Sequence, residues 1–165
     1  MHIHITGDQE DDQETAMPTK TERKDLLDIG QNCAALRTRM AARGVTRAYD
    51  AALRPLGIKI TQFTLLVTAK YEAELSIGDM ADFLAMERST LTRNLKLLAD
   101  MGLIEMRKGS APRTKVPVIT SRGDALLTRA IPLWRDAQAR LTAHIGKTRW
   151  KDARALLTDL SLAPV

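Results

Sequence analysis

Cysteine is almost absent from this chain of 165 residues, in which Cys33 is the single example. One cysteine excludes an intrachain disulfide framework and is typical of a reducing compartment. Long apolar runs are absent too, because no stretch approaches the roughly 18 consecutive apolar residues of a transmembrane helix. The N-terminus also lacks the basic and then apolar pattern of a signal peptide. We therefore expect a cytoplasmic protein that does not associate with a membrane.

The sequence also lacks the patterns that enzymes use. It has no glycine-rich phosphate loop, no nucleophile elbow and no pair of carboxylates placed for acid–base chemistry. The three histidines (His2, His4 and His144) are too scattered along the chain to form a metal cluster. We expect neither an enzyme nor a protein that holds a cofactor or a metal.

Aromatic residues make up only 4% of the chain, so Leu, Ala and Met must fill most of the core. This composition favours helices, and the length suits one domain. The formal net charge is +5, but residues 1–20 hold five acids and one base, which leaves 24 bases and 15 acids, a net of +9, in the remainder. A basic domain suits a polyanionic partner, although many basic proteins are merely soluble.

The first third of the chain predicts a tail and two helices. Residues 1–20 are polar and acidic and are expected to be disordered, with Met17 as an alternative start. Lys24–Leu53 has apolar residues mostly three or four apart, which predicts one long helix. Thr61 is expected to cap a short second helix.

The last third predicts two more helices. The first begins at Thr120 or Ser121 and ends near Ile145, with Pro132 kinking or dividing it. The second covers residues 148–160 and has its apolar side chains on one side. Because these terminal helices keep apolar surface with no partner left in their own chain, we expect a homodimer, most simply with twofold symmetry.

The stretch between these ends, Leu75–Thr120, has the order of a winged helix-turn-helix. Ser76 is expected to cap a short helix, with Asp79 completing a capping box. A turn over residues 85–87 follows, and a second N-cap is expected within residues 88–90. The second helix ends near Asp100, where Gly102 can adopt the left-handed conformation that often follows a helix.

The second helix of this pair has two distinct faces. At roughly 100° per residue, its leucines (Leu91, Leu95 and Leu98) cluster on a core face. Ser89, Arg93 and Lys96 lie opposite, with Thr92 and Leu97 on the flanks. An arginine can donate two hydrogen bonds to guanine, whereas a lysine more often meets phosphate. The alternative is an ordinary amphipathic helix with a solvated face.

A β-hairpin is expected next, with strands over residues 103–107 and 115–120 and a basic loop over residues 108–114. Pro117 cannot donate a ladder bond, so its strand should lie at an edge or be irregular. Arg113 can enter a narrow minor groove, although a mobile solvated loop is the alternative. The DNA-binding residues that we expect are Arg88, Ser89, Thr90, Thr92, Arg93, Lys96, Arg113 and Lys115.

This stretch resembles the multiple antibiotic resistance regulator (MarR) family of bacterial transcription factors. The matching segments are Ser89–Arg93 with Leu95 and Leu98, Gly102–Ile104, Val118–Thr120 with Gly123, Leu56–Ile58 and Thr61–Phe63. The resemblance implies a triangular homodimer that binds a palindromic operator in double-stranded DNA through two winged domains. Where the family wing carries Asp-Arg-Arg, this chain has Ala111-Pro112-Arg113, so the aspartate that supports the wing is missing.

The expected fold is mainly α with a small β-hairpin wing: a winged helix-turn-helix whose N- and C-terminal helices form a dimerisation region. The expected segments are residues 1–20 (disordered acidic tail), 21–56 (N-terminal dimerisation helix), 57–120 (DNA-binding domain) and 121–165 (C-terminal dimerisation helices). The expected function is sequence-specific transcriptional regulation, with repression favoured over activation. A winged-helix module that binds an acidic protein is the alternative.

The resemblance also implies regulation, either by a small aromatic or amphipathic ligand or by cysteine oxidation. Cys33 lies near the position of the family's reactive cysteines, but a small buried core residue is the more usual interpretation. Several large side chains could line a ligand cavity, although side chains of this kind are more often plain core; these are Met40, Tyr49, Met86, Trp134 and Trp150.

Overall fold

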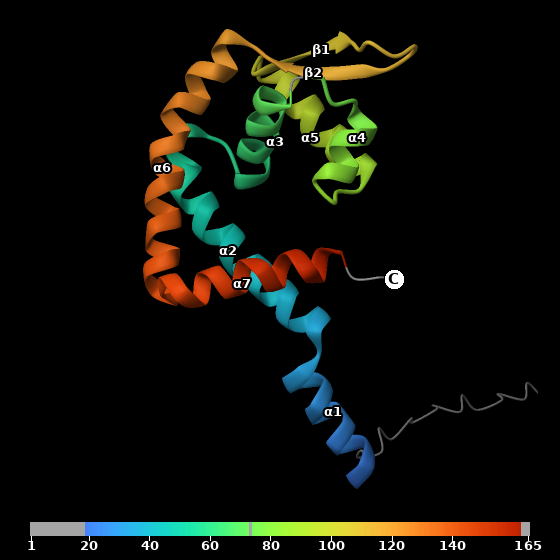
Figure 1. Cartoon of the computed structure of the whole chain (residues 1–165), viewed down its shortest axis with the longest axis vertical. Coiled ribbons are helices and arrows are strands. Elements are labelled where there is room, and N and C mark those ends of the chain that lie inside the picture. The colour runs from blue at the N-terminus through green and yellow to red at the C-terminus, as the bar shows by residue number, and fades with distance from the viewer. Residues whose placement is uncertain (1–18, 73, 163–165) are drawn as a thin grey trace, which may run out of the picture. The chain divides into compact units, whose positions relative to one another are not determined.

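A computed structural model describes residues 19–72 and 74–162, and the chain divides into two compact units, Met1–Ala42 and Arg43–Val165. The expected disorder of residues 1–20 therefore lies almost wholly outside the described residues. In chain order the elements are α1 (Lys20–Asn32), α2 (Ala34–Leu53), the 3-10 helix η1 (Arg54–Leu56), α3 (Ile60–Tyr71), α4 (Ile77–Phe83), α5 (Arg88–Asp100), β1 (Ile104–Lys108), β2 (Lys115–Ile119), α6 (Ser121–Ile145) and α7 (Lys147–Ser161) (Figure 1).

The first unit contains a helix break that the apolar spacing did not predict. α1 begins at Lys20, after a capping box in which Thr19 and Glu22 bond each other. The Thr19 backbone N–H donates to the Glu22 carboxylate, which lowers the pKa of Glu22. The expected single helix over Lys24–Leu53 is wrong, because Cys33 has extended backbone angles. The Arg37 side chain donates to the carbonyls of Gly30 and Gln31, and so satisfies the end of α1.

The second unit begins within α2, which passes through Gly44 without interruption. The following α3 is not capped by Thr61. Its N-cap is Lys59, whose backbone N–H donates a hydrogen bond of 2.8 Å to the side-chain oxygen of Gln62. The Ile60 backbone N–H donates a hydrogen bond of 2.7 Å to the Asp50 carboxylate on α2. The Asp50 carboxylate, ten residues before Ile60, therefore accepts a hydrogen bond at the start of α3, where the sequence predicted that the Thr61 hydroxyl would do so.

The core of this unit lies between α3, α5 and α6, with the end of α2 beside them. Tyr49 is buried and donates its hydroxyl hydrogen to Gln138 on α6, and its burial raises the pKa of that phenol. Trp134 stacks on Phe63 with a ring-centroid distance of 6.3 Å. Tyr49 is therefore a core residue, and the partly buried Trp134 packs against the core.

The hairpin is a two-stranded antiparallel sheet in which Ile104 pairs with Ile119 and Lys108 with Lys115. Pro117, opposite Met106, is buried and lies on a strand with one unpaired edge, as its missing N–H requires. In Figure 1 the hairpin lies at one end of the second unit, over α3, α4 and α5. The expected start of the second strand agrees with the observed one, and the other three strand limits differ by one residue each.

The start of α6 is fixed against the turn that follows α5. Thr120 is the N-cap, as expected: its hydroxyl oxygen accepts from Gly123 and its hydroxyl hydrogen is donated to the Gly102 carbonyl. A Cβ on Gly123 would lie 2.1 Å from the Leu103 carbonyl oxygen, so only glycine allows this approach. The start of α6 therefore meets the turn between α5 and β1 at a defined point.

The long α6 continues through Pro132 as one element, so the proline does not divide the helix. Gly146, at a φ of 91°, separates α6 from α7. The described helices include none that is both long enough and apolar enough to cross a membrane.

Candidate nucleic-acid interface

The helix-turn-helix pair is α4 and α5. Ser76 caps α4 as expected, accepting from the Asp79 backbone N–H over 3.2 Å and donating its own hydroxyl hydrogen to the Asp79 carboxylate. In the turn, Ala85 has a φ of 48°, and the Met86 backbone N–H donates to the Ala81 carbonyl over 2.9 Å. A non-glycine residue in the left-handed region is strained and is often found at functional turns.

The start of α5 differs from the sequence prediction. The N-cap is Glu87, which provides no side-chain cap, and not a residue within 88–90. Arg88, Ser89 and Thr90 are therefore the first three helical residues. The Arg88 guanidinium lies back over α4, with Nη2 4.0 Å from Asp82 and 3.6 Å from where a Cβ on Gly78 would stand. Ser89 is left exposed at the tip of the helix, with the half-buried Thr90 beside it.

The two faces of α5 agree with the helical-wheel prediction. Leu91, Leu95 and Leu98 are at most 2% exposed and join the core. Thr90 is half-buried, and the predicted polar face is exposed at Ser89, Thr92, Arg93 and Lys96. The core therefore fixes which side chains α5 presents to a ligand.

The exposed residues of α5 differ in their existing partners. The Thr92 hydroxyl donates to the Arg88 carbonyl over 2.7 Å, and Lys96 forms an ion pair with Asp100 at 2.9 Å. Arg93 takes part in none of the ion pairs and side-chain hydrogen bonds between described residues. Its guanidinium is thus available to a ligand without the loss of an ion pair or side-chain hydrogen bond to another described residue.

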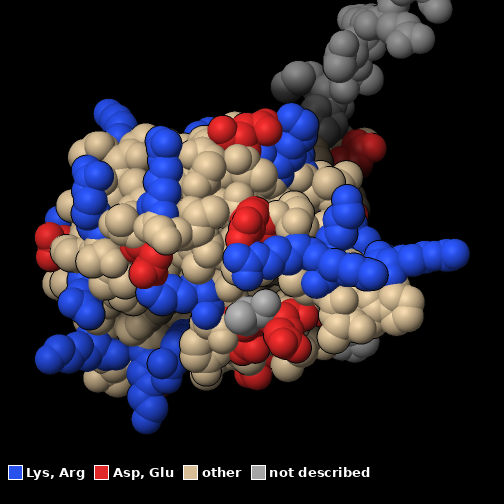
Figure 2. All heavy atoms as spheres, turned by 90° about the horizontal axis from the view of Figure 1, so that it is seen from above, with Lys and Arg blue, Asp and Glu red and all other residues tan. Residues whose placement is uncertain are grey.

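The wing presents a second pair of cations. Arg107 on β1 is paired with Glu105, whereas Arg113 and Lys115 are exposed and absent from the ion pairs of the described residues. Arg113 and Lys115 face the first turn of α4 across a hollow of 330 Å³. Figure 2, which looks onto the hairpin end of Figure 1, shows many Lys and Arg side chains projecting from this face among fewer acidic ones. The structure thus places α4, α5 and the basic wing beside one another.

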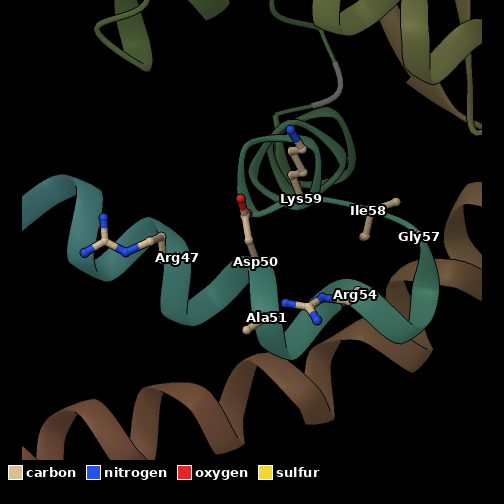
Figure 3. Close-up of a pocket in the computed structure, with 7 residues that line it drawn as sticks. All are labelled: Arg47, Asp50, Ala51, Arg54, Gly57, Ile58 and Lys59. Atoms are coloured by element: carbon tan, nitrogen blue, oxygen red, sulfur yellow. The ribbon is translucent and has the colours of Figure 1, made fainter.

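Sequence reasoning missed a hollow of 490 Å³ at the junction of α2 and α3. Its lining is Arg47, Asp50 and Ala51 from α2, Arg54 from η1, and Gly57, Ile58 and Lys59 from the connection to α3 (Figure 3). None of the five large side chains proposed as cavity residues is part of this lining. The signal that could have found the hollow is the spacing of Arg47, Asp50 and Arg54, which puts three charges on one helix face.

Cys33, the redox candidate, is half-buried at the break between α1 and α2, and its thiol is free. It belongs to the first unit, whereas every predicted DNA-binding residue belongs to the second.

The geometry above can be compared with known proteins. The model of the MarR family matches residues 58–110. Over 112 residues the chain is 28% identical to the HTH-type transcriptional repressor Rv2887 of Mycobacterium tuberculosis, an alignment that covers 67% of this chain and 81% of the relative.

Two crystal structures of the M. tuberculosis transcriptional regulator MosR are also similar. One is 39% identical with a TM-score of 0.70, and the match covers 80% of this chain and 95% of MosR. The other, a complex with DNA, is 36% identical with a TM-score of 0.68 and covers 81% of this chain and 100% of that one. The expected winged helix-turn-helix is confirmed, and its relatives are transcriptional regulators and not enzymes. The chain belongs to the MarR family of DNA-binding transcriptional regulators.

Proposed function

We propose that this protein is a homodimeric repressor that binds a palindromic operator through the exposed face of α5 and the wing. The observation that carries the proposal is Arg93, which has no ion-pair partner among the described residues. It lies on the exposed face of a helix whose opposite face is held by buried leucines. Arg93 donates to guanine in the major groove, and Ser89, Thr90 and Thr92 contact neighbouring bases or phosphates. Arg88, Lys96 and Lys115 contact phosphates, and Arg113 enters the minor groove.

Dimerisation is proposed from the apolar surface of the terminal helices. Leu26, Leu27 and Ile29 on α1 are all more than half exposed, and no α1 side chain is buried. On α7, Leu156, Leu157 and Leu160 are also exposed. Monomeric proteins rarely expose contiguous apolar patches of this kind. We therefore assign residues 21–56 and 121–165 to the dimer interface, and residues 57–120 to DNA binding.

Repression is proposed because Rv2887, whose sequence aligns with two thirds of this chain, is named a transcriptional repressor. MosR supports the DNA-binding part, because that relative has been crystallised with DNA. A bound dimer that covers a promoter would exclude the polymerase, whereas activation would need a further contact.

The proposed function is tested by selecting bound duplexes from a random DNA pool with the full-length protein. We expect a palindromic consensus, a stoichiometry of two chains per site, and affinity that falls steeply with salt. Equal affinity for all duplexes at physiological salt would contradict sequence-specific regulation. A specific protein partner combined with no DNA footprint would instead favour the interaction module.

We further propose that an anionic small molecule relieves repression by binding the α2–α3 hollow. Three cations (Arg47, Arg54 and Lys59) and one acid line it, and no aromatic side chain does. In Figure 3, Asp50 and Lys59 stand at the α3 side, with Arg47 and Arg54 along α2 and η1. Because Asp50 also caps α3 through Ile60, a ligand that displaces this carboxylate would loosen α3, against which α5 packs.

The ligand proposal is tested with carboxylated and phosphorylated metabolites as probes. A ligand should raise the melting temperature and release operator DNA, and the paired substitution Arg47→Gln with Arg54→Gln should abolish both effects. Arg140→Gln, at an exposed position on α6 outside the hollow, is the matched control. Ligand release that survives the paired substitution would place the ligand elsewhere.

A further inference from the structure

The tip of the wing contains a left-handed residue that is not glycine. Arg113 has a φ of 62°, in a region that glycine and asparagine adopt most readily. The Thr114 backbone N–H donates to the Ala111 carbonyl over 3.2 Å, so residues 111–114 form a β-turn. Pro112 fixes a negative φ at the second position, and the positive φ at the third gives the type II pattern. Strain of this kind persists where the surrounding structure maintains it, often at a functional site.

Two further contacts close this turn. The Thr114 hydroxyl donates to the Ala111 carbonyl over 2.6 Å, and the Gly109 backbone N–H donates to the Thr114 carbonyl over 2.9 Å. A Cβ on Gly109 would lie only 2.5 Å from the Thr114 hydroxyl oxygen. The Thr114 side chain thus lies against Gly109 on the other side of the loop, and Pro112 and Thr114 together hold the turn at Arg113.

The turn places Arg113 on the same surface of the protein as the helix-turn-helix, opposite the start of α4. Arg113 and Lys115 line one wall of the 330 Å³ hollow, and Ser76, Ile77 and Gly78 of the α4 region line the other. The arginine therefore belongs to the surface that the helix-turn-helix also forms. Unlike Arg107, it has no carboxylate partner among the described residues.

We propose that Pro112 and Thr114 are positioning residues, which hold Arg113 in its left-handed conformation and so present its guanidinium to the minor groove of A·T-rich DNA. A loop that is already closed loses less conformational entropy on binding than an open one. A narrow A·T minor groove has the more negative potential and attracts arginine. The inference rests on the proposed function, because it requires the wing to contact DNA.

The test compares Thr114→Val, which removes the hydroxyl, with Thr114→Ser, which keeps it. The full-length proteins are titrated by fluorescence anisotropy against the selected duplex, flanked by A·T or by G·C pairs. We expect Thr114→Val to bind the A·T-flanked duplex roughly fivefold more weakly and Thr114→Ser to bind within about twofold of wild type. The preference for A·T flanks should fall in Thr114→Val while the central consensus stays unchanged. Equal affinities of the two variants would overturn the inference.

A double-mutant cycle with Arg113→Ala shows whether Thr114 acts through Arg113. Thr114→Val should cost no further affinity once Arg113 is alanine, whereas additive losses would overturn the positioning role. Pro112→Ala should behave as Thr114→Val does, with melting temperatures showing that both variants are folded. If Arg113→Ala alone binds like wild type, the wing does not contact DNA, and that part of the proposed function fails together with the inference. A weakened Arg113→Ala beside an unchanged Thr114→Val refutes the positioning role alone.

Discussion

Helix α5 and the wing tip each present an arginine, but different interactions hold the two arginines in position. Arg93 stands on α5, whose opposite face contributes three buried leucines to the core. Arg113 stands in the β-turn of residues 111–114, whose first three residues are exposed, and local hydrogen bonds and a proline maintain it. Substitutions behind Arg93 should therefore unfold the domain, whereas the wing can be loosened while the fold survives.

The largest effect is expected from Leu98→Ala. Leu98 is fully buried, and its truncation should lower the free energy of unfolding by about 2–5 kcal/mol because it leaves a cavity. Urea denaturation measures the change. Leu97→Ala is the control on the same helix: Leu97 is 47% exposed, and its loss should cost less than about 1 kcal/mol. Similar losses of stability for the two leucines would contradict the assignment of Leu98 to the buried face of α5 and Leu97 to its exposed side.

At the wing, Gly109→Ala should reduce DNA affinity with little effect on stability. The added Cβ would lie 2.5 Å from the Thr114 hydroxyl and force it away from Ala111. We expect roughly fivefold weaker operator binding and a change in unfolding free energy below about 1 kcal/mol. Ser110→Ala, at an exposed neighbouring position, should change neither. A large loss of stability in Gly109→Ala would show that the wing supports the core, against the comparison drawn above.

A smaller effect is expected from Lys96→Ala. This lysine already pairs with Asp100 on the surface, so its removal should barely alter stability. DNA binding should weaken by a similar factor for all sequences, and the slope of log affinity against log salt should fall by about 1. Asp100→Asn should have the opposite effect, because it frees the ammonium group for phosphate. A change of base preference in Lys96→Ala would assign this residue a reading role.

The smallest effect is expected from Cys33→Ser. Cys33 is half-buried in the first unit, and we expect the wild type and this variant to bind operator equally with and without peroxide. Release of the wild type alone by peroxide would instead support the redox alternative.

Sequence predicted best those features that a local pattern determines. The core face of α5 follows from helical periodicity, and Ser76, Gly102 and Thr120 mark helix ends through their own chemistry. The edge position of the Pro117 strand follows from its missing donor.

Features that depend on a side chain from a neighbouring helix were not predictable from a local pattern. The break at Cys33 depends on Arg37 turning back to the end of α1. The α3 cap depends on Asp50 rather than Thr61. The same junction of α2 and α3 borders the basic hollow, whose charges appear in the sequence as an ordinary solvated helix face.

Selecting duplexes from a random pool with Arg93→Ala beside wild type tests the central claim most directly. If α5 reads DNA through its exposed face, the variant should lose the preference for guanine at one position in each half-site and keep the other positions, because one bidentate contact supplies roughly 1–3 kcal/mol of discrimination. The same consensus recovered at uniformly lower affinity would show that Arg93 binds only phosphate, and would contradict the account.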